Sequence, residues 1–187
     1  MQNGSRRISS PFELSSHHVW GVSMRDEIRR DPFCIGDNLP AYLGARMNQL
    51  GLDARTVDTA LFIDQLIAPG FVQGIAAILL NNDVPLRIHG SGWDALPQFA
   101  DIRGGPVRTR EHFEQVVAGA GALVHPSPLK GPHLCHAFGR PVVHGLQDGP
   151  AKLVATAVRA LTSPRTAVLP SLSPLCPQRI AQLCPMS

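Results

Sequence analysis

Apolar residues gather in short runs along the middle of the chain, and glycine and proline turns separate these runs. Short apolar runs that end in turns are typical of buried strands, whereas longer stretches with a period near 3.6 residues predict helices. We therefore expect strands at residues 59–63, 84–89, 102–107, 121–125 and 141–144. Helices are expected at residues 69–80, 110–118, 131–138 and 150–161, the second of them capped by Thr109.

The alternation of strands and helices, without two-residue hairpin turns, indicates an α/β fold: a Rossmann-like parallel sheet with helices on both faces. Ligands bind to such sheets outside the carboxyl ends of the strands. The candidate edge is therefore formed by the loops that follow Ile63, His89, His125 and His144.

The two ends of the chain differ from this middle part. Short helices are expected at residues 24–30 and 42–50, separated by turn-forming residues, but no alternating strand pattern precedes residue 57. Prolines accumulate after residue 162, which predicts an extended or disordered tail that adds little to the core. We divide the chain into an irregular, partly helical segment (1–56), a Rossmann-like nucleotide-sugar-binding domain (57–162) and a proline-rich tail (163–187).

The composition fits one globular domain, with 187 residues, 44% hydrophobic and 17% charged. A net charge of +3 without a basic stripe gives no reason to expect a nucleic-acid partner. The four cysteines form no CxxC pair, so neither a zinc knuckle nor a disulfide framework is indicated. No signal peptide is recognised, and no apolar run reaches the roughly 20 residues of a membrane span, so we expect a cytoplasmic location.

A glycine turn, Gly90-Ser91-Gly92-Trp93, follows the expected strand at residues 84–89. Glycines at such a turn let backbone N–H groups approach a phosphate closely. The turn also begins a G-x-G-x-x-A pattern, but Pro97 stands inside the helix that would carry a dinucleotide pyrophosphate. A tight turn in which Trp93 is only a packing residue is the structural alternative.

A second candidate lies between the expected strands at residues 121–125 and 141–144. The exposed N–H groups of Gly131, His133 and Leu134 at a helix start, with the charge of Lys130 beside them, would bind an anion such as a diphosphate. The alternative is an ordinary helix start with a solvated lysine. The candidate residues for binding a donor diphosphate or nucleotide are Gly90, Ser91, Gly92, Trp93, Ser127, Lys130, Gly131 and His133.

Several histidines stand near this second region. His133 and His136 have metal-ligand spacing on a helix, but no carboxylate stands nearby in the sequence, so we expect no metal site. These histidines are interpreted as hydrogen-bonding residues of a pocket at the strand ends, as at His89 and His125, or as residues with ordinary hydrogen bonds on a helix surface. The absence of a nucleophile elbow leaves no support for a Ser-His-Asp triad.

The order of these pieces resembles the C-terminal domain of GT-B glycosyltransferases, and most closely the spore-maturation type. Leu86 to Trp93 is similar to that family's strand ending in Gly-x-Gly-Trp, and Gly139 to Val143 to its Gly-x-Pro-Val-Val segment, with Gly104 to Val107 between them. The resemblance covers residues 57–161. It implies a half-domain that binds a nucleotide sugar as substrate without a cofactor, with residues 127–133 over the diphosphate and the glycine turn at the same rim.

Two departures from the family bear on activity. Many retaining members carry two glutamates where this chain has Pro126 and Leu134, and residues 1–56 are too few for a second Rossmann domain. Three functions therefore stay open: a glycosyltransferase that transfers a sugar to an unknown acceptor, a non-catalytic nucleotide-sugar-binding or interaction module, and an NAD(P)-dependent oxidoreductase. A half-cleft exposes apolar surface, so we expect a homodimer or a partner chain that supplies the missing half.

Overall fold

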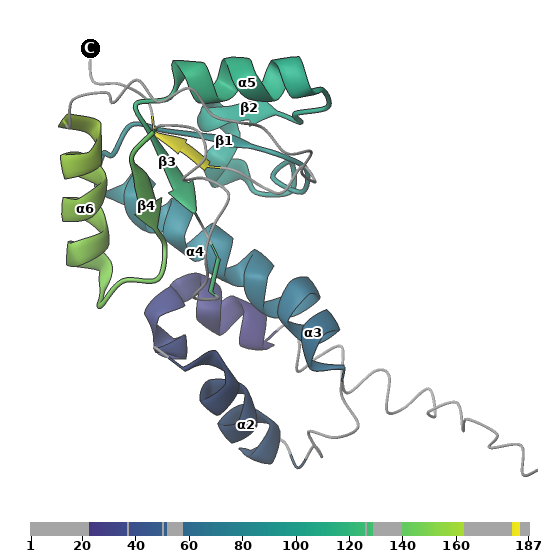
Figure 1. Ribbon diagram of the computed structural model, residues 1–187. Helices are drawn as coiled ribbons and strands as arrows, with labels where there is room; N and C mark the ends of the chain where they lie inside the picture. The colour runs from purple at the N-terminus through teal and green to yellow at the C-terminus, as the bar shows by residue number, and fades with distance from the viewer. Residues whose placement is uncertain are drawn as a thin grey trace, which may run out of the picture.

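The computed structural model describes residues 23–36, 38–49, 51, 58–125, 127–128, 140–162 and 181–183, which form a mixed α/β unit (Figure 1). Its strands are β1 (Leu86–His89), β2 (Arg103–Gly105), β3 (Ala122–His125), β4 (Val142–His144) and β5 (Ala181–Leu183). Its helices are residues 23–30, η1 (Pro32–Ile35), α2 (Leu39–Gln49), α3 (Thr59–Phe62), η3 (Ile63–Ile67), α4 (Ala68–Asn81), η4 (Pro97–Ile102), α5 (Arg110–Gly119) and α6 (Pro150–Thr162).

The five strands form one sheet in the order β2-β1-β5-β3-β4. β1 pairs with β2 in parallel, and β3 pairs with β4 in parallel, which confirms the expected direction of these four strands. β5 is antiparallel to both of its neighbours, β1 and β3. The sheet is therefore mixed and not wholly parallel. Its middle strand comes from residues that the sequence analysis placed in the proline-rich tail.

The expected strand at residues 59–63 is wrong, because these residues are helical in α3 and in the first turn of η3. The π-helix η3, which follows α3, is explained by Pro69 at the start of α4. Proline has no N–H and its ring displaces the carbonyl four residues earlier, so the helix widens there. The N–H of Ala68 accordingly bonds to the carbonyl of Ile63, five residues back. A short apolar run is compatible with a strand or with a helix. Here the run is helical, and Phe62 and Ile63 pack against the core.

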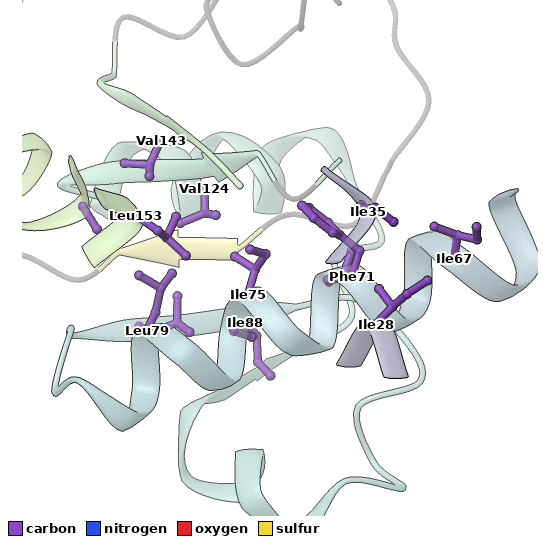
Figure 2. Packing of buried hydrophobic residues seen from close by; sticks show 14 of the residues in the cluster. Ile28, Ile35, Ile67, Phe71, Ile75, Leu79, Ile88, Val124, Val143 and Leu153 are labelled. Atoms are coloured by element: carbon purple, nitrogen blue, oxygen red, sulfur yellow. The ribbon is translucent and has the colours of Figure 1, made fainter. Parts of the chain in front are cut away.

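The main core lies between one face of the sheet and the two helices that cover it, α4 and α6. Figure 2 shows Ile75 and Leu79 of α4 lying between Ile88 of β1 and Leu153 of α6. On β3, Val124 points into this core, whereas its neighbour Leu123 packs with Val117 of α5 and with Ala120, which follows α5, on the opposite face. Side chains alternate across a strand, so one strand serves both layers.

The N-terminal helices pack on the far half of α4 (Figure 1). A Cβ atom at Gly70 would lie 2.7 Å from the carbonyl oxygen of Arg25, and one at Gly74 would lie 2.8 Å from that of Arg29. The two helices therefore approach at a small-residue stripe, Gly70-x-x-x-Gly74, with their backbones nearly in contact. The expected helices at residues 24–30 and 42–50 are confirmed, with ends shifted by up to a few residues, and belong to the same core as the sheet.

One helix in the described part of the chain, Ile63–Asn81, is long and apolar enough to span a bilayer by length and composition. The central helix of an α/β domain has the same properties when its side chains are buried. Phe71, Ile75 and Leu79 are almost fully buried in this helix. These buried residues belong to the core of the α/β unit.

Candidate ligand-binding edge of the sheet

Three strands end in a histidine, and the three histidines share one face of the sheet. His89, His125 and His144 are the last residues of β1, β3 and β4. The residue before each of them points into the α4 and α6 core, so each histidine points to the side of α5. His125 and His144 are register partners, and their ring centroids lie 5.9 Å apart.

The first histidine of this row is at the same level as the second. Ile88 and Val124 both pair with Ala181, so the residues that follow them, His89 and His125, end their strands together on either side of β5. The carboxyl edge therefore presents imidazoles from three strands. The sequence predicts histidines at strand ends, and the register of the strands shows that they form one row.

The imidazole of His89 is enclosed by two neighbouring elements, α5 and β2. It is 5% exposed, and the ring of His112 from α5 lies edge-on to it at a centroid distance of 6.4 Å. A Cβ atom at Gly104 of β2 would lie 2.2 Å from its Cε1 atom. Thr109 fixes the first turn of α5, because its hydroxyl accepts from the N–H of His112 at 3.1 Å, as expected for an N-cap. Neither His112 nor Gly104 could be recognised as a site residue from the sequence, because neither role follows from a strand or turn pattern.

The loops after β1 and β3 leave the edge in opposite directions. After β1 the chain continues to its outer neighbour β2, and after β3 it continues to its outer neighbour β4 on the other side of the sheet. The two loops therefore diverge above the middle of the sheet. In open α/β sheets such a divergence creates a crevice at the carboxyl edge, where ligands bind.

The glycine turn lies at one side of this divergence and forms as expected. Gly90 and Gly92 have positive φ angles of 113° and 85°. The N–H of Gly90 donates to the carbonyl of Gly105 at 3.1 Å, so it extends the β1–β2 pairing. Ser91 and Gly92 are exposed, and a Cβ atom at Gly92 would meet nothing within 4 Å. The outer part of the turn therefore offers backbone to an approaching ligand.

Trp93 closes the turn and packs into the core. It is 6% exposed, and its ring stands edge-on to that of Phe99 with centroids 5.2 Å apart. Trp93 is therefore a packing residue, as in the structural alternative for this turn. Its indole Nε1 is buried and has no hydrogen-bond partner among the described residues.

Arg103 ties the next part of this loop to β2. Its guanidinium contacts the carboxylate of Asp94 at 2.9 Å, across the loop from the turn. An ion pair this exposed holds its loop only weakly.

The second candidate region is described only in part. Ser127 is half-buried, two residues after His125. Lys130, Gly131 and His133, and the helix expected at residues 131–138, lie outside the described residues. Within the described ranges, no group of three or more His, Cys, Asp and Glu side chains could hold a metal ion.

Arg140, which belongs to a segment that carries the family resemblance, has a structural role. Its guanidinium donates to the carbonyls of Val117 at 3.2 Å and Ala118 at 2.7 Å. These are among the last carbonyls of α5, which have no partner within the helix. A cation at a helix C-terminus also interacts favourably with the helix dipole. Arg140 therefore caps α5 and leads the chain into β4.

Comparison of the chain with models of protein families, with curated proteins and with solved structures gives no match. The glycosyltransferase resemblance thus stays a prediction from the residues that carry it, and the geometry of the carboxyl edge is the observation on which a function can be argued.

Proposed function

We propose that the chain binds the diphosphate of a nucleotide sugar at the carboxyl edge of the sheet. The supporting observation is that the glycine turn after β1 and Ser127 after β3 stand on the two sides of the loop divergence, at the edge of the sheet where the histidine row ends its strands. On this proposal the chain is the donor-binding half of a glycosyltransferase of the GT-B type. A second copy or a partner chain supplies the acceptor side.

The strand order supports the fold on which this proposal depends. A doubly wound sheet has the order 3-2-1-4-5. Numbered in that scheme, β1, β2, β3 and β4 stand at positions 2, 3, 4 and 5, and β5 stands at position 1. The ligand crevice of that fold lies between positions 1 and 4, which is the site of the loop divergence in this chain.

The chemistry of the edge suits a phosphate group. The backbone at Ser91 and Gly92 is open to solvent, so an anion can approach its N–H groups without meeting a Cβ atom at the glycine. The imidazoles of His125 and His144, which are half-buried at the ends of β3 and β4, can add N–H donors. Donors of this kind stabilise the charge of a departing diphosphate when they are held in place.

A specific observation favours the second candidate function, a binding module without turnover of its own. Residues 59–63 are helical, so no loop leaves the carboxyl edge from a first parallel strand. That loop contributes to the crevice in a complete doubly wound sheet. In this conformation the chain holds fewer of the elements that surround a donor than a full half-domain does.

The geometry gives less support to an NAD(P) site. A dinucleotide fingerprint requires an α-helix that opens directly after the glycine turn, because the helix N-terminus holds the pyrophosphate. Here the chain passes through an extended Leu96 into the 3-10 helix η4, which Pro97 begins. The pyrophosphate position of that fingerprint is therefore missing.

A ligand screen on the full chain tests the proposal. We expect a nucleoside diphosphate or its sugar conjugate, among UDP, GDP, ADP and dTDP, to raise the melting temperature in a concentration-dependent way. Gly92→Ala should weaken this effect, since the new Cβ projects into the open space above the turn. The same screen includes NAD(H).

Gly36→Ala is the matched control. Gly36 also has a positive φ, 57°, and a Cβ atom there also meets nothing within 4 Å, but it ends η1 and is not at the turn. Both variants place alanine at a positive φ, and only Gly92→Ala should reduce binding. No shift with any diphosphate, or equal losses in both variants, would contradict the proposal; a shift with NAD(H) alone would replace it by the oxidoreductase interpretation.

A further inference from the structure

We propose that residues 59–63 and β5 are alternative occupants of the middle strand position of the sheet. In the observed conformation β5 fills this position and residues 59–63 are helical. In the second conformation residues 59–63 form a parallel strand between β1 and β3, and β5 is released. The inference goes beyond the proposed nucleotide site, and its tests require no ligand.

The order of the sheet identifies the position. The two parallel pairs, β1–β2 and β3–β4, are joined only through β5. In the doubly wound order this position belongs to the first strand of the domain, which precedes the first crossover helix. The segment that precedes the first crossover helix of this chain, α4, is residues 59–67.

The path of the chain permits residues 59–63 to occupy that position. α5 connects β2 to β3 on one face of the sheet, and α4 lies on the opposite face. Crossovers between parallel strands are right-handed. A connection from the middle position to β1 runs across the sheet in the opposite direction to the connection from β2 to β3. Its helix must therefore lie on the face opposite α5, which is where α4 already lies.

The sequence around α4 contains the start of a separate helix. Proline is favoured at the first turn of a helix and disfavoured in its interior. Pro69 stands in the first turn of α4, yet in the observed conformation η3 and α3 continue the helix before it. With a strand at residues 59–63, residues 64–67 become a connection of ordinary length between strand and helix.

The helix that must unwind is weakly held. α3 adds only four residues at the end of the helix, and η3, which joins it to α4, has the wide hydrogen bonding of a π-helix. Ile67 is the one buried residue of η3, whereas Asp64 and Gln65 are exposed. Thr, Phe and Ile are also among the residues that strands favour.

The strand that must leave is equally short. β5 has three residues, runs antiparallel in an otherwise parallel sheet and is joined to α6 by residues 163–180. It begins level with Ile88 and Val124, at the carboxyl edge, and ends level with Leu86 and Ala122. β5 therefore begins at the edge that carries the histidine row. In the second conformation the loop of residues 64–67 would join that edge.

A proline in β5 tests the exchange directly. Gln182 pairs with Arg87 on one side and Leu123 on the other, and proline is excluded from a strand with neighbours on both sides. In the full chain carrying Gln182→Pro, we expect the Cα and Cβ chemical shifts of residues 59–63 to change from helical to extended values. Ser187→Pro, beyond the strand, should leave them helical. A folded Gln182→Pro chain in which residues 59–63 stay helical would overturn the proposal.

A disulfide trap gives an answer even if that variant does not fold. In the second conformation, with the strand ends level, positions 61 and 62 lie beside position 87 of β1, and one of the two points to the same face. In the observed conformation α3 lies beyond the far end of α4 from β1 (Figure 1). The test uses the full chain with its four native cysteines replaced by serine and carrying Arg87→Cys with either Leu61→Cys or Phe62→Cys.

We expect one of these two pairs to form an intramolecular disulfide under mild oxidation, because a disulfide requires Cα atoms within about 7 Å. Adding Pro69→Ala favours one continuous helix through residues 59–81 and should lower the yield several-fold. If neither pair forms, or if Pro69→Ala leaves the yield unchanged, residues 59–63 do not exchange with β5.

Discussion

The imidazole of His89 occupies the space that a side chain at position 104 would need, since a Cβ atom on Gly104 would lie 2.2 Å from His89 Cε1. β1 and β2 are neighbours in the sheet, and this contact seats the first histidine of the row against β2. The glycine therefore determines where the imidazole lies at the carboxyl edge.

We expect Gly104→Ala to lower the free energy of unfolding by about 1–3 kcal/mol, because the added methyl group forces the buried ring or the strand to move. Denaturant unfolding of the single variant and of Gly104→Ala in a His89→Ala background measures the coupling. The penalty should shrink in that background. Gly105→Ala, where a Cβ atom meets nothing within 4 Å, should cost the same with or without His89. An equal Gly104→Ala penalty in both backgrounds would show that the ring does not set the constraint.

The crossing of the N-terminal helix over α4 makes a second prediction. Gly70→Ala and Gly74→Ala should each destabilise the chain by about 1–3 kcal/mol. Each new Cβ meets a backbone carbonyl, which cannot move aside as a flexible side chain can. Gly44→Ala in α2 is the matched control, because that helix glycine has open space around it. Alanine there should stabilise by about 0.5–1 kcal/mol. Thermal unfolding that ranks the three variants otherwise would contradict the crossing geometry.

Tyr42 predicts a dependence of stability on alkaline pH. Burial raises the pKa of its phenol above the ordinary value of 10.0, with smaller contributions from the charge and the hydrogen bond of Cys34. The thiol of Cys34 lies 3.9 Å from the phenol oxygen, and burial raises its pKa as well, from an ordinary 9.0. A raised folded-state pKa favours the protonated form, so the stability it contributes is complete below the unfolded-state pKa and is lost as the pH rises through the folded-state value.

The free energy of unfolding should therefore fall as the pH rises above about 9, and Tyr42→Phe should flatten its decline above about 10. Tyr42 is the one tyrosine in the chain, so phenolate absorbance reports it alone. Cys34→Ala should move the absorbance midpoint down toward the ordinary value without reaching it, because burial remains the larger cause. Ionisation of Tyr42 in the native chain with a midpoint at the ordinary pKa of 10.0 would contradict a buried phenol.

Arg140 supplies a prediction about α5. Arg140→Ala should cost about 1 kcal/mol and speed amide hydrogen exchange at the end of α5, because the Ala118 carbonyl loses the guanidinium and that of Val117 keeps only the N–H of Ala120. Arg110→Ala removes an exposed ion pair with Glu114 at the start of the same helix and should change stability by less. Similar effects of the two substitutions would argue against the capping role.

The helices with strong periodic patterns and clear ends could be predicted from the sequence. Thr109 marks the start of α5, and the apolar stretch after Pro69 marks α4 to within a few residues. The failure at residues 59–63 has a physical cause, because a five-residue apolar run carries no periodicity that distinguishes a strand from a helix. β5 was missed because three residues within a proline-rich tail give no strand pattern of their own.

The candidate site could be predicted in outline. The rule for parallel sheets placed it at the strand ends, and the turn at Gly90 formed as expected. The histidine row depends on the register of β3 and β4, and the enclosure of His89 depends on β2 and α5, so neither could be obtained from local sequence. The Gly70-x-x-x-Gly74 spacing was present in the sequence and could have indicated the helix crossing.

Amide NMR mapping of nucleotide binding is the direct test of a diphosphate site at the carboxyl edge. The full chain is titrated with UDP, and then with the other nucleoside diphosphates, while the amides of Gly90 to Trp93 and Ser127 and the imidazole signals of His125 and His144 are followed. We expect saturable shifts at these positions with one nucleotide, and weaker binding in Gly92→Ala than in Gly36→Ala. Saturable shifts confined to other parts of the molecule, or no saturable shift with any nucleotide, would contradict a diphosphate site at the carboxyl edge of the sheet.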